Sequence, residues 1–201
     1  MKILTSLCVA FVLCAGSAVQ AATFKFTDEH RASTSSFTME SESGLELTVS
    51  GGAFKKGSKT VTTHKGYGLS VGRHLINRKE YVRLDFSHSV SLWGFLAGYV
   101  DKFDDYVVYG KGADGFEEIQ TGDFGVSNRH GGNRNRALVK LWGDASDFVS
   151  TSFVISVADK WDEFKLRGLK VHEVAPVPLP AGAILLLSGL GFFAFRRRRT
   201  A

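Results

Sequence analysis

Between Thr23 and Val174 the apolar residues recur in short alternating runs, and no long stretch has the 3.6-residue period of a helix. Such alternation is typical of strands that bury one face. In Tyr81–Phe86, for example, Val82 and Leu84 fall on the same side as Phe86. Runs of this kind, separated by Gly, Asp, Asn and Ser, predict strands at Thr23–Phe26, Ser36–Glu40, Leu45–Ser50, Tyr81–Phe86, Val90–Val100, Tyr106–Tyr109, Phe116–Gln120, Ala137–Trp142, Thr151–Val157 and Glu163–Val171.

Short strands with Gly-rich connections predict an all-β fold, a single β-sandwich domain of the jelly-roll kind. We expect this domain to cover residues 22–175, a length that is sufficient for one hydrophobic core. The alternation in Glu163–Val171 slips at Gly168, which predicts a β-bulge there. The Gly and Asp residues of Lys111–Gly115 predict a hairpin loop.

The N-terminus is expected to be a secretion signal. Lys2 precedes an apolar run, and small residues close the segment, with Val19 and Ala21 at the −3 and −1 positions of a cleavage site. This is the three-part layout of a signal peptide, and its apolar run is too short for a permanent membrane anchor. We therefore predict a signal peptide over residues 1–21, with the secretion translocon and signal peptidase as partners.

The C-terminus is expected to cross a membrane once. Residues 181–195 carry no charge, and the cluster Arg196, Arg197, Arg198 and Arg199 follows them. A helix over this segment would be about 22 Å long. That is less than the roughly 30 Å of a hydrocarbon core, but bilayer thinning and snorkelling Arg side chains can close the difference. Because basic residues mark the cytoplasmic side, the rest of the chain would lie outside.

A specific motif, Val177, Pro178, Leu179, Pro180 and Ala181, precedes this apolar segment. Motif, apolar segment and Arg cluster in this order resemble the VPLPA-type PEP-CTERM sorting signals, and the resemblance covers residues 176–201. It implies export from a Gram-negative bacterium that makes exopolysaccharide, and processing near the motif by an exosortase, a membrane protease. A transient inner-membrane anchor would then precede delivery to the cell surface or the extracellular matrix.

A second and looser resemblance concerns the middle of the chain. Gly66–Val71, Glu80–Phe86 and Val90–Leu92 are similar to strands of the sandwich domains that often precede such tails. This resemblance implies the fold and no substrate.

The formal charge of +5 belongs to the two ends of the chain. Removing Lys2 and the four Arg of residues 196–199 from 25 basic residues leaves 20, which equals the 20 acidic residues. The mature domain is therefore near neutral, so nucleic acid is not an expected partner. Cys8 and Cys14 both lie in the signal, which excludes disulfides and thiolate metal sites from the mature domain.

An acidic segment is the candidate metal site. Asp101, Asp104 and Asp105 lie between two predicted strands, and calcium binds carboxylate and carbonyl oxygens on loops. The spacing fits neither an EF-hand nor an RTX repeat, so an ordinary solvated turn is the alternative. Calcium is thus a possible cofactor.

Two groups of residues are candidates for binding a glycan. Arg129, Asn133, Arg134 and Arg136 lie in a polar, Gly-containing stretch that predicts an exposed loop, and Arg forks and Asn amides suit an acidic polysaccharide. The second group contains Trp93, Trp142 and Trp161, which could form a sugar-stacking face. The first two of these Trp residues fall inside predicted strands, which favours core packing instead.

Catalytic patterns are weak in this chain. Gly68–Gly72 fits G-x-S-x-G, but no amphipathic helix follows, which favours a Gly-rich strand over a nucleophile elbow. We therefore expect a non-catalytic cell-surface or matrix protein, with exopolysaccharide as its candidate ligand. The alternative is a glycan hydrolase or lyase, for which Asp85 and Asp101 are candidate carboxylates.

Overall fold

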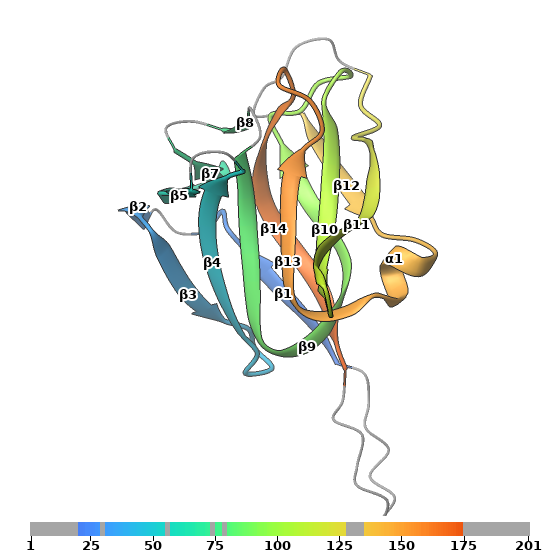
Figure 1. The fold of residues 1–201 in the computed structure, drawn as a ribbon. Coiled ribbons are helices and arrows are strands. Elements are labelled where there is room, and N and C mark those ends of the chain that lie inside the picture. The colour runs from blue at the N-terminus through green and yellow to red at the C-terminus, as the bar shows by residue number, and fades with distance from the viewer. Residues whose placement is uncertain are drawn as a thin grey trace, which may run out of the picture. The chain divides into compact units, whose positions relative to one another are not determined.

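Strand β9 (Glu80–Gly98) is the longest described strand, and it organises the fold (Figure 1). This computed structural model describes residues 20–174 apart from 29–30, 55–56, 73–74, 78–79 and 128–134, and for 31 and 32 it describes the backbone alone. The predicted signal peptide up to residue 19 and the predicted sorting tail, residues 176–201, lie outside the described residues, as do Arg129, Asn133 and Arg134.

The described residues form fourteen strands and one short helix, so the prediction of an all-β fold is confirmed. The elements are β1 Ala21–Lys25, β2 Arg31–Thr34, β3 Ser36–Glu40, β4 Glu46–Ala53, β5 Gly57–Lys59, β6 Val61–His64, β7 Gly68–Val71, β8 Ile76–Asn77, β9, β10 Asp105–Gly112, β11 Gly115–Asp123, β12 Arg136–Lys140, α1 Asp144–Asp147, β13 Val149–Val157 and β14 Glu163–Glu173. All described pairings are antiparallel. In this part of the chain, no helix is long and apolar enough to cross a membrane.

The two halves of β9 belong to different layers. The first half pairs with β4 and β13, and β13 pairs in turn with β10. The second half pairs with β12 and β14, and β14 pairs with β1. The change occurs between Asp85, which lies opposite Ser152, and Val90, which lies opposite Ser150. The extra residues of β9 at this irregularity let it bend from the front layer of Figure 1 to the back layer.

The hydrophobic core lies between these layers. Phe95 from the second half of β9 packs against Tyr106 of β10 with ring centroids 5.4 Å apart and planes at 85°. Phe86 from the first half packs against Phe24 of β1 at 6.1 Å. Such tilted and edge-on contacts suit the ring quadrupole and add to the free energy gained by burial. Strands β12, β14 and β1 therefore bury one face and present the other to solvent.

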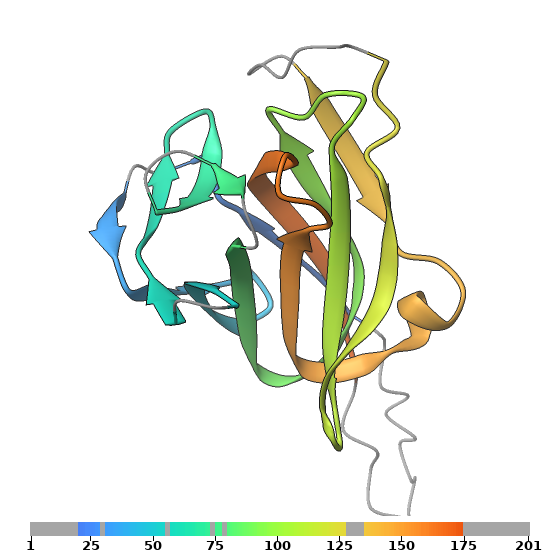
Figure 2. The same ribbon diagram turned by 45° about the horizontal axis from the view of Figure 1, so that its top comes forward.

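The two layers are bridged by a side chain at one side and are open at the other. The buried Gln120 side chain of β11 donates to the Tyr106 hydroxyl at 2.7 Å and accepts from the Trp142 backbone N–H at 3.3 Å, which joins the edges of β11 and β12. On the other side, β1 pairs with β14 and β3 pairs with β4, and a groove of about 870 Å³ separates β1 from β3. Figure 2 shows β2 to β7 on this open side.

All ten strands predicted from alternation are observed. None of them extends more than two residues beyond the end of the observed strand that contains it. Tyr81–Phe86 and Val90–Val100 belong to the single strand β9, because the bend between them breaks the alternation without breaking the strand. The predicted hairpin at Lys111–Gly115 joins β10 to β11. The predicted bulge lies one residue earlier, at Arg167, where the register shifts between Leu166 and Gly168.

Candidate functional site

The acidic segment that the sequence singled out is folded into a tight turn. Asp104 is 4% exposed, and its carboxylate accepts the backbone N–H of Asp101 at 2.6 Å and that of Glu163 at 2.9 Å. Asp101 in turn accepts the N–H of Phe103 at 2.8 Å. Both carboxylates thus satisfy backbone donors, as Asp side chains commonly do in turns.

Burial is the main cause that raises the pKa of the Asp104 carboxyl to about 6, and Asp101 and Asp162 raise it further by repulsion. Burial also raises the pKa of Asp105, with added repulsion from Asp123 and Asp159. Within the residues that the structure describes, no three His, Cys, Asp or Glu side chains are arranged to hold a metal ion. Calcium binding at Asp101, Asp104 and Asp105 stays a prediction.

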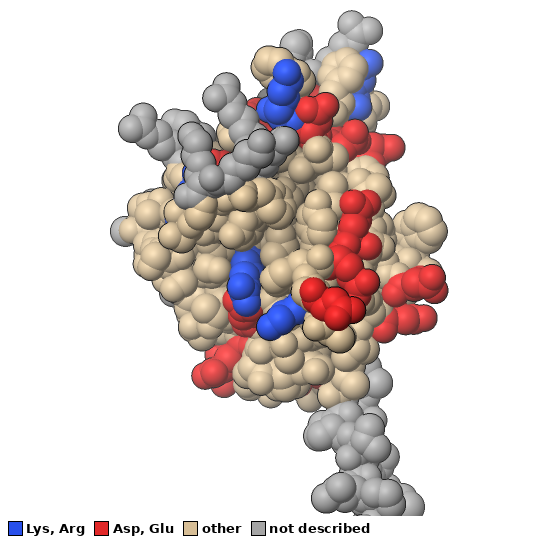
Figure 3. Space-filling model, viewed as in Figure 1, with Lys and Arg blue, Asp and Glu red and all other residues tan. Residues whose placement is uncertain are grey.

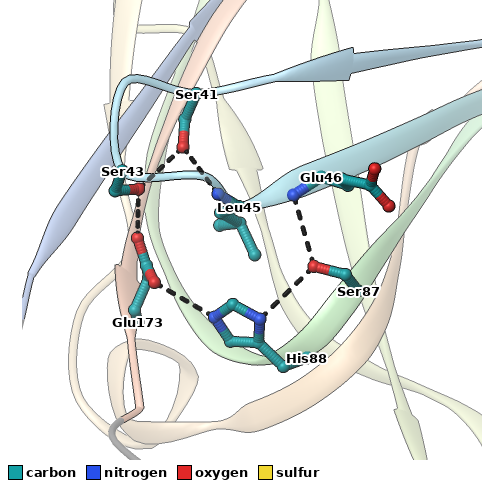
Figure 4. A network of polar contacts seen from close by, with 7 residues as sticks. All are labelled: Ser41, Ser43, Leu45, Glu46, Ser87, His88 and Glu173. Atoms are coloured by element: carbon teal, nitrogen blue, oxygen red, sulfur yellow. Dashed lines mark hydrogen bonds and ion pairs between the residues drawn. The ribbon is translucent and has the colours of Figure 1, made fainter.

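A polar network at the bend of β9 has the composition of a hydrolytic triad (Figure 4). His88 Nδ1 lies 3.3 Å from Ser87 Oγ, and His88 Nε2 lies 3.0 Å from Glu173 Oε2. Glu173 also accepts a hydrogen bond from Ser43, which lies in the turn between β3 and β4.

The geometry of this network favours a structural role over catalysis. Ser87 Oγ already accepts the backbone N–H of Glu46 at 3.2 Å, and the His88 side chain is 46% exposed. A nucleophile also needs preorganised donors for the developing oxyanion, and none of the contacts drawn in Figure 4 supplies a pair of N–H groups beside Ser87. The network ties the bend of β9 to the end of β14 and to the β3–β4 turn.

The other catalytic candidates are equally unsuited. Ser70, from the G-x-S-x-G pattern, lies 3.4 Å from His64 Nε2 and donates to the Thr62 carbonyl at 3.4 Å, but it is in strand β7 with no exposed surface that a substrate could reach. Asp85 lies within β9 and is held by Arg83 and Ser152, whereas Asp101 lies in the turn after that strand. No described contact joins these two carboxylates.

The groove between β1 and β3 offers three carboxylates, those of Asp28, Glu40 and Glu42. All three residues are exposed. A glycosidase needs one carboxylic acid that its surroundings keep protonated, and a solvated rim does not provide this. The groove therefore does not have the arrangement of a glycosidase site.

The most distinctive surface of the described chain is a basic face. We give this name to the outer surface of β1, β12, residues 90–98 of β9 and residues 164–172 of β14. These segments contain no Asp or Glu. Their core-facing residues, such as Val139 and Leu166, alternate with cations of differing exposure. Of these cations, Lys25, Arg136 and Lys140 are exposed and Lys170 is half-buried, whereas Lys165 and Arg167 are 9% and 5% exposed.

Trp93 lies at the centre of this face between two ammonium groups. Lys140 Nζ is 5.2 Å and Lys170 Nζ is 4.9 Å from its ring centroid. Gly94 lies opposite Lys140 on one side and opposite Lys170 on the other, and the β12 backbone approaches it so closely that a Cβ atom would collide with the Val139 carbonyl oxygen. The result is a half-buried indole flanked by cations on both neighbouring strands.

A second group of rings and cations lies further along β14. Lys165 Nζ is 5.0 Å from the Tyr99 ring centroid and 5.7 Å from that of Tyr67, and the two rings lie 6.1 Å apart. Arg167 donates to the backbone carbonyls of Tyr67 at 3.1 Å and Gly66 at 2.9 Å. Tyr99 has a backbone φ of 62°, a left-handed conformation that costs a non-Gly residue free energy and is common at functional sites.

Burial and the concentration of positive charge on the basic face lower the pKa values of two of its residues. Burial lowers the pKa of Lys165, and repulsion by Arg167 lowers it further. The pKa of Arg167 is lowered by burial and then by Arg136. Acidic residues also lie elsewhere: β11 carries Glu117 and Glu118, and α1 carries Asp144 and Asp147. Figure 3 shows one face of the molecule, on which acidic residues lie together with several Lys and Arg.

The sequence-based prediction of core packing is wrong for two Trp residues, and the first is Trp93, which is half-buried on the outer surface of β9. The second is Trp142, which is 73% exposed. It continues the alternation of β12, in which Ala137, Val139 and Leu141 are buried and the residues between them point outward. Of the predicted ligand-binding loop residues, Arg136 lies on the basic face at the start of β12.

Sequence comparison adds no relatives to this description. No protein-family model matches the chain, and the search of curated proteins finds no match either. The function therefore has to be argued from the described surfaces.

Proposed function

We propose that the mature chain is a non-catalytic surface or matrix protein that binds an acidic exopolysaccharide through the basic face. One observation carries this proposal: Lys140 and Lys170 lie over Trp93, and Lys165 lies over Tyr67 and Tyr99, on strand segments that contain no carboxylate. A neutral domain gains nothing in stability from such a concentration of like charge, because the cations repel one another.

The chemistry of an acidic sugar matches this surface. The C–H groups of a pyranose ring can pack on the indole of Trp93, whose face is electron-rich. A carboxylate or sulfate on the same sugar can then pair with Lys140 or Lys170, whose ammonium groups lie over that ring. Arg136 can add a bidentate contact to the next acidic group along the polymer.

The predicted export and sorting signals at the two ends of the chain would bring the domain to the compartment that contains such a ligand. The predicted signal peptide, residues 1–21, would deliver the protein to the translocon and signal peptidase. The VPLPA-type tail, residues 176–201, would hold it briefly in the inner membrane of a Gram-negative bacterium until an exosortase processes it. The layered arrangement around β9 supports a β-sandwich of the jelly-roll kind as the exported domain.

The proposal is tested by isothermal titration of the exported protein with oligosaccharides of a polyuronate. Trp93→Ala should weaken binding by about tenfold or more, which is the loss of roughly 1.4 kcal/mol of stacking and cation–π energy. Trp161→Ala is the matched control, because Trp161 is 77% exposed and lies 4.9 Å from Lys160 Nζ, but is near Asp159 and Asp162 in a loop. Equal affinities for the two variants would contradict the proposal.

A further inference from the structure

A second cluster of rings lies on the opposite layer, on the outer surface of β4, β9, β13 and β10. Phe54, directly after β4, is 55% exposed. Its ring centroid lies 5.0 Å from that of Tyr81 and 5.9 Å from that of Tyr109. We call these three residues the aromatic ridge. The Phe54 ring is tilted by 47° to Tyr81 and by 64° to Tyr109, so the three rings form an apolar cluster with one exposed ring at its surface.

Small residues on the neighbouring strands leave room for the Tyr81 ring. Gly52 lies opposite Tyr81 in the ladder between β4 and β9, and a Cβ atom at this position would collide with the Tyr81 ring. The missing side chain lets the Tyr81 ring lie flat over the backbone of β4. On β13, the small side chain of Ser156 lies opposite Tyr81 in the other direction.

Hydrogen-bonding groups lie next to the ridge on the same surface. Arg83 pairs with Asp85 Oδ1 through Nε at 3.0 Å and Nη2 at 2.9 Å, and Ser152 Oγ donates to the same oxygen at 2.7 Å. No donor among the described residues reaches Asp85 Oδ2, and no described acceptor is bonded to Arg83 Nη1. The two side chains are 40% and 35% exposed, so one donor and one acceptor remain for a ligand.

The charge of this surface determines the kind of ligand. Arg83 is balanced by Asp85, and Glu118 lies opposite Tyr109 in the β10–β11 ladder. Figure 3 shows both acidic and basic residues on this side of the molecule. Because Arg83 and Asp85 neutralise each other beside the ridge, this pair offers a polyanion no net positive charge, in contrast to the Lys residues over Trp93. A pyranose ring without negative charge fits, because it combines an apolar C–H face with neighbouring hydroxyls that can both donate and accept.

We propose that the aromatic ridge, with Arg83 and Asp85, binds uncharged pyranose rings of a glycan. The ring stacks on Phe54, and its hydroxyls bond to Asp85 Oδ2 and Arg83 Nη1. This site uses none of the residues of the basic face, and the hydrophobic core separates the two surfaces. One protein can then hold an acidic polysaccharide on one layer and a neutral one on the other, which makes it a cross-linker of the matrix.

The test is titration of the exported protein with two probes, a neutral β-glucan hexasaccharide and a polyuronate hexasaccharide. The neutral probe should bind, and Phe54→Ala and Asp85→Asn should each weaken its binding by about tenfold or more. The same variants should bind the polyuronate as the natural protein does. Phe103→Ala is the matched control, because Phe103 is 65% exposed and lies 4.4 Å from Lys102 Nζ in a loop, away from the ridge.

The outcomes separate this proposal from the proposed function. Loss of neutral-glucan binding in Phe54→Ala, with normal polyuronate binding, supports the ridge even if Trp93→Ala turns out to have no effect. The ridge proposal is overturned if the neutral probe does not bind, or if Phe103→Ala weakens its binding as much as Phe54→Ala. Thermal unfolding of each variant shows whether a loss of binding reflects a loss of fold.

Discussion

Replacement of Asp104 by Asn should change stability in opposite directions at low and at neutral pH. Asp104 is almost fully buried, and its pKa is raised from 3.8 to about 6 in the folded protein. A carboxyl whose folded pKa lies above its unfolded value binds more protons in the folded state. Its contribution to stability is therefore favourable at low pH and is lost as pH rises from about 4 through about 6.

The size of this effect follows from the shift. A difference of roughly two pKa units corresponds to about 3 kcal/mol, because each unit is worth 1.36 kcal/mol. This is an upper bound, because water near the turn screens the charge. For a domain of this size the corresponding change in Tm is on the order of 6–12 °C.

The Asn side chain removes the titration and one of the two acceptors. Asp104 accepts N–H groups from both Asp101 and Glu163, and Asn can accept through one oxygen. That loss costs about 1 kcal/mol at any pH. At pH 4 the variant should therefore be less stable by about this amount, whereas at pH 7 it should be more stable, by up to about 2 kcal/mol.

The assay is denaturant unfolding of both proteins between pH 4 and pH 7.5 in a chelating buffer. The natural protein should lose stability across this range, and the variant should lose less. If Asp104→Asn were destabilising by the same amount at every pH, burial would not control the ionisation of this carboxyl.

Three predictions come from the ends of the chain and the acidic turn. Mass spectrometry of the exported protein should find Ala22 as the first residue, and a start within the apolar run would contradict cleavage after Ala21. Replacing Pro178 and Pro180 with Ala should leave the protein in the inner membrane, as fractionation with a matching exosortase would show, and normal surface delivery would refute the sorting signal. If the acidic turn binds calcium, the ion at about 100 times its Kd should stabilise the fold by roughly 2.7 kcal/mol, and Asp105→Asn should abolish this gain. Equal Tm values in calcium and in chelator would identify an ordinary turn.

The strands could be predicted from the sequence because the residues that alternate as apolar positions are the ones that a strand buries on one face. Val82, Leu84 and Phe86 alternate in the sequence and are buried in the structure. Short strands such as β5 (Gly57–Lys59) and β8 (Ile76–Asn77) carry no such signal. They pair because β4 and β14 present edges to them.

The basic face could not be predicted, because its residues come from four segments that pairing brings together. Lys140 and Lys170 are thirty positions apart, yet both lie beside Trp93, because β12 and β14 flank the same half of β9. The equal numbers of acidic and basic residues between the two ends of the chain gave no sign of this local group of cations. One usable signal was present: the alternation in Arg136–Lys140 places its cations away from the core.

The most direct test of the central claim, that the basic face binds an acidic polysaccharide, is the salt dependence of polyuronate binding. The exported protein and its Lys140→Gln/Lys170→Gln variant would be titrated at several salt concentrations. Salt screens exposed charges, and binding to a polyanion releases counterions. The natural protein should therefore lose affinity steeply with salt. The variant should bind more weakly at low salt, and its affinity should fall less steeply with salt. Lys102→Gln/Lys160→Gln is the control, because it removes two Lys residues that lie beside exposed rings elsewhere. This control should behave as the natural protein does. Equal slopes for all three proteins would contradict the account.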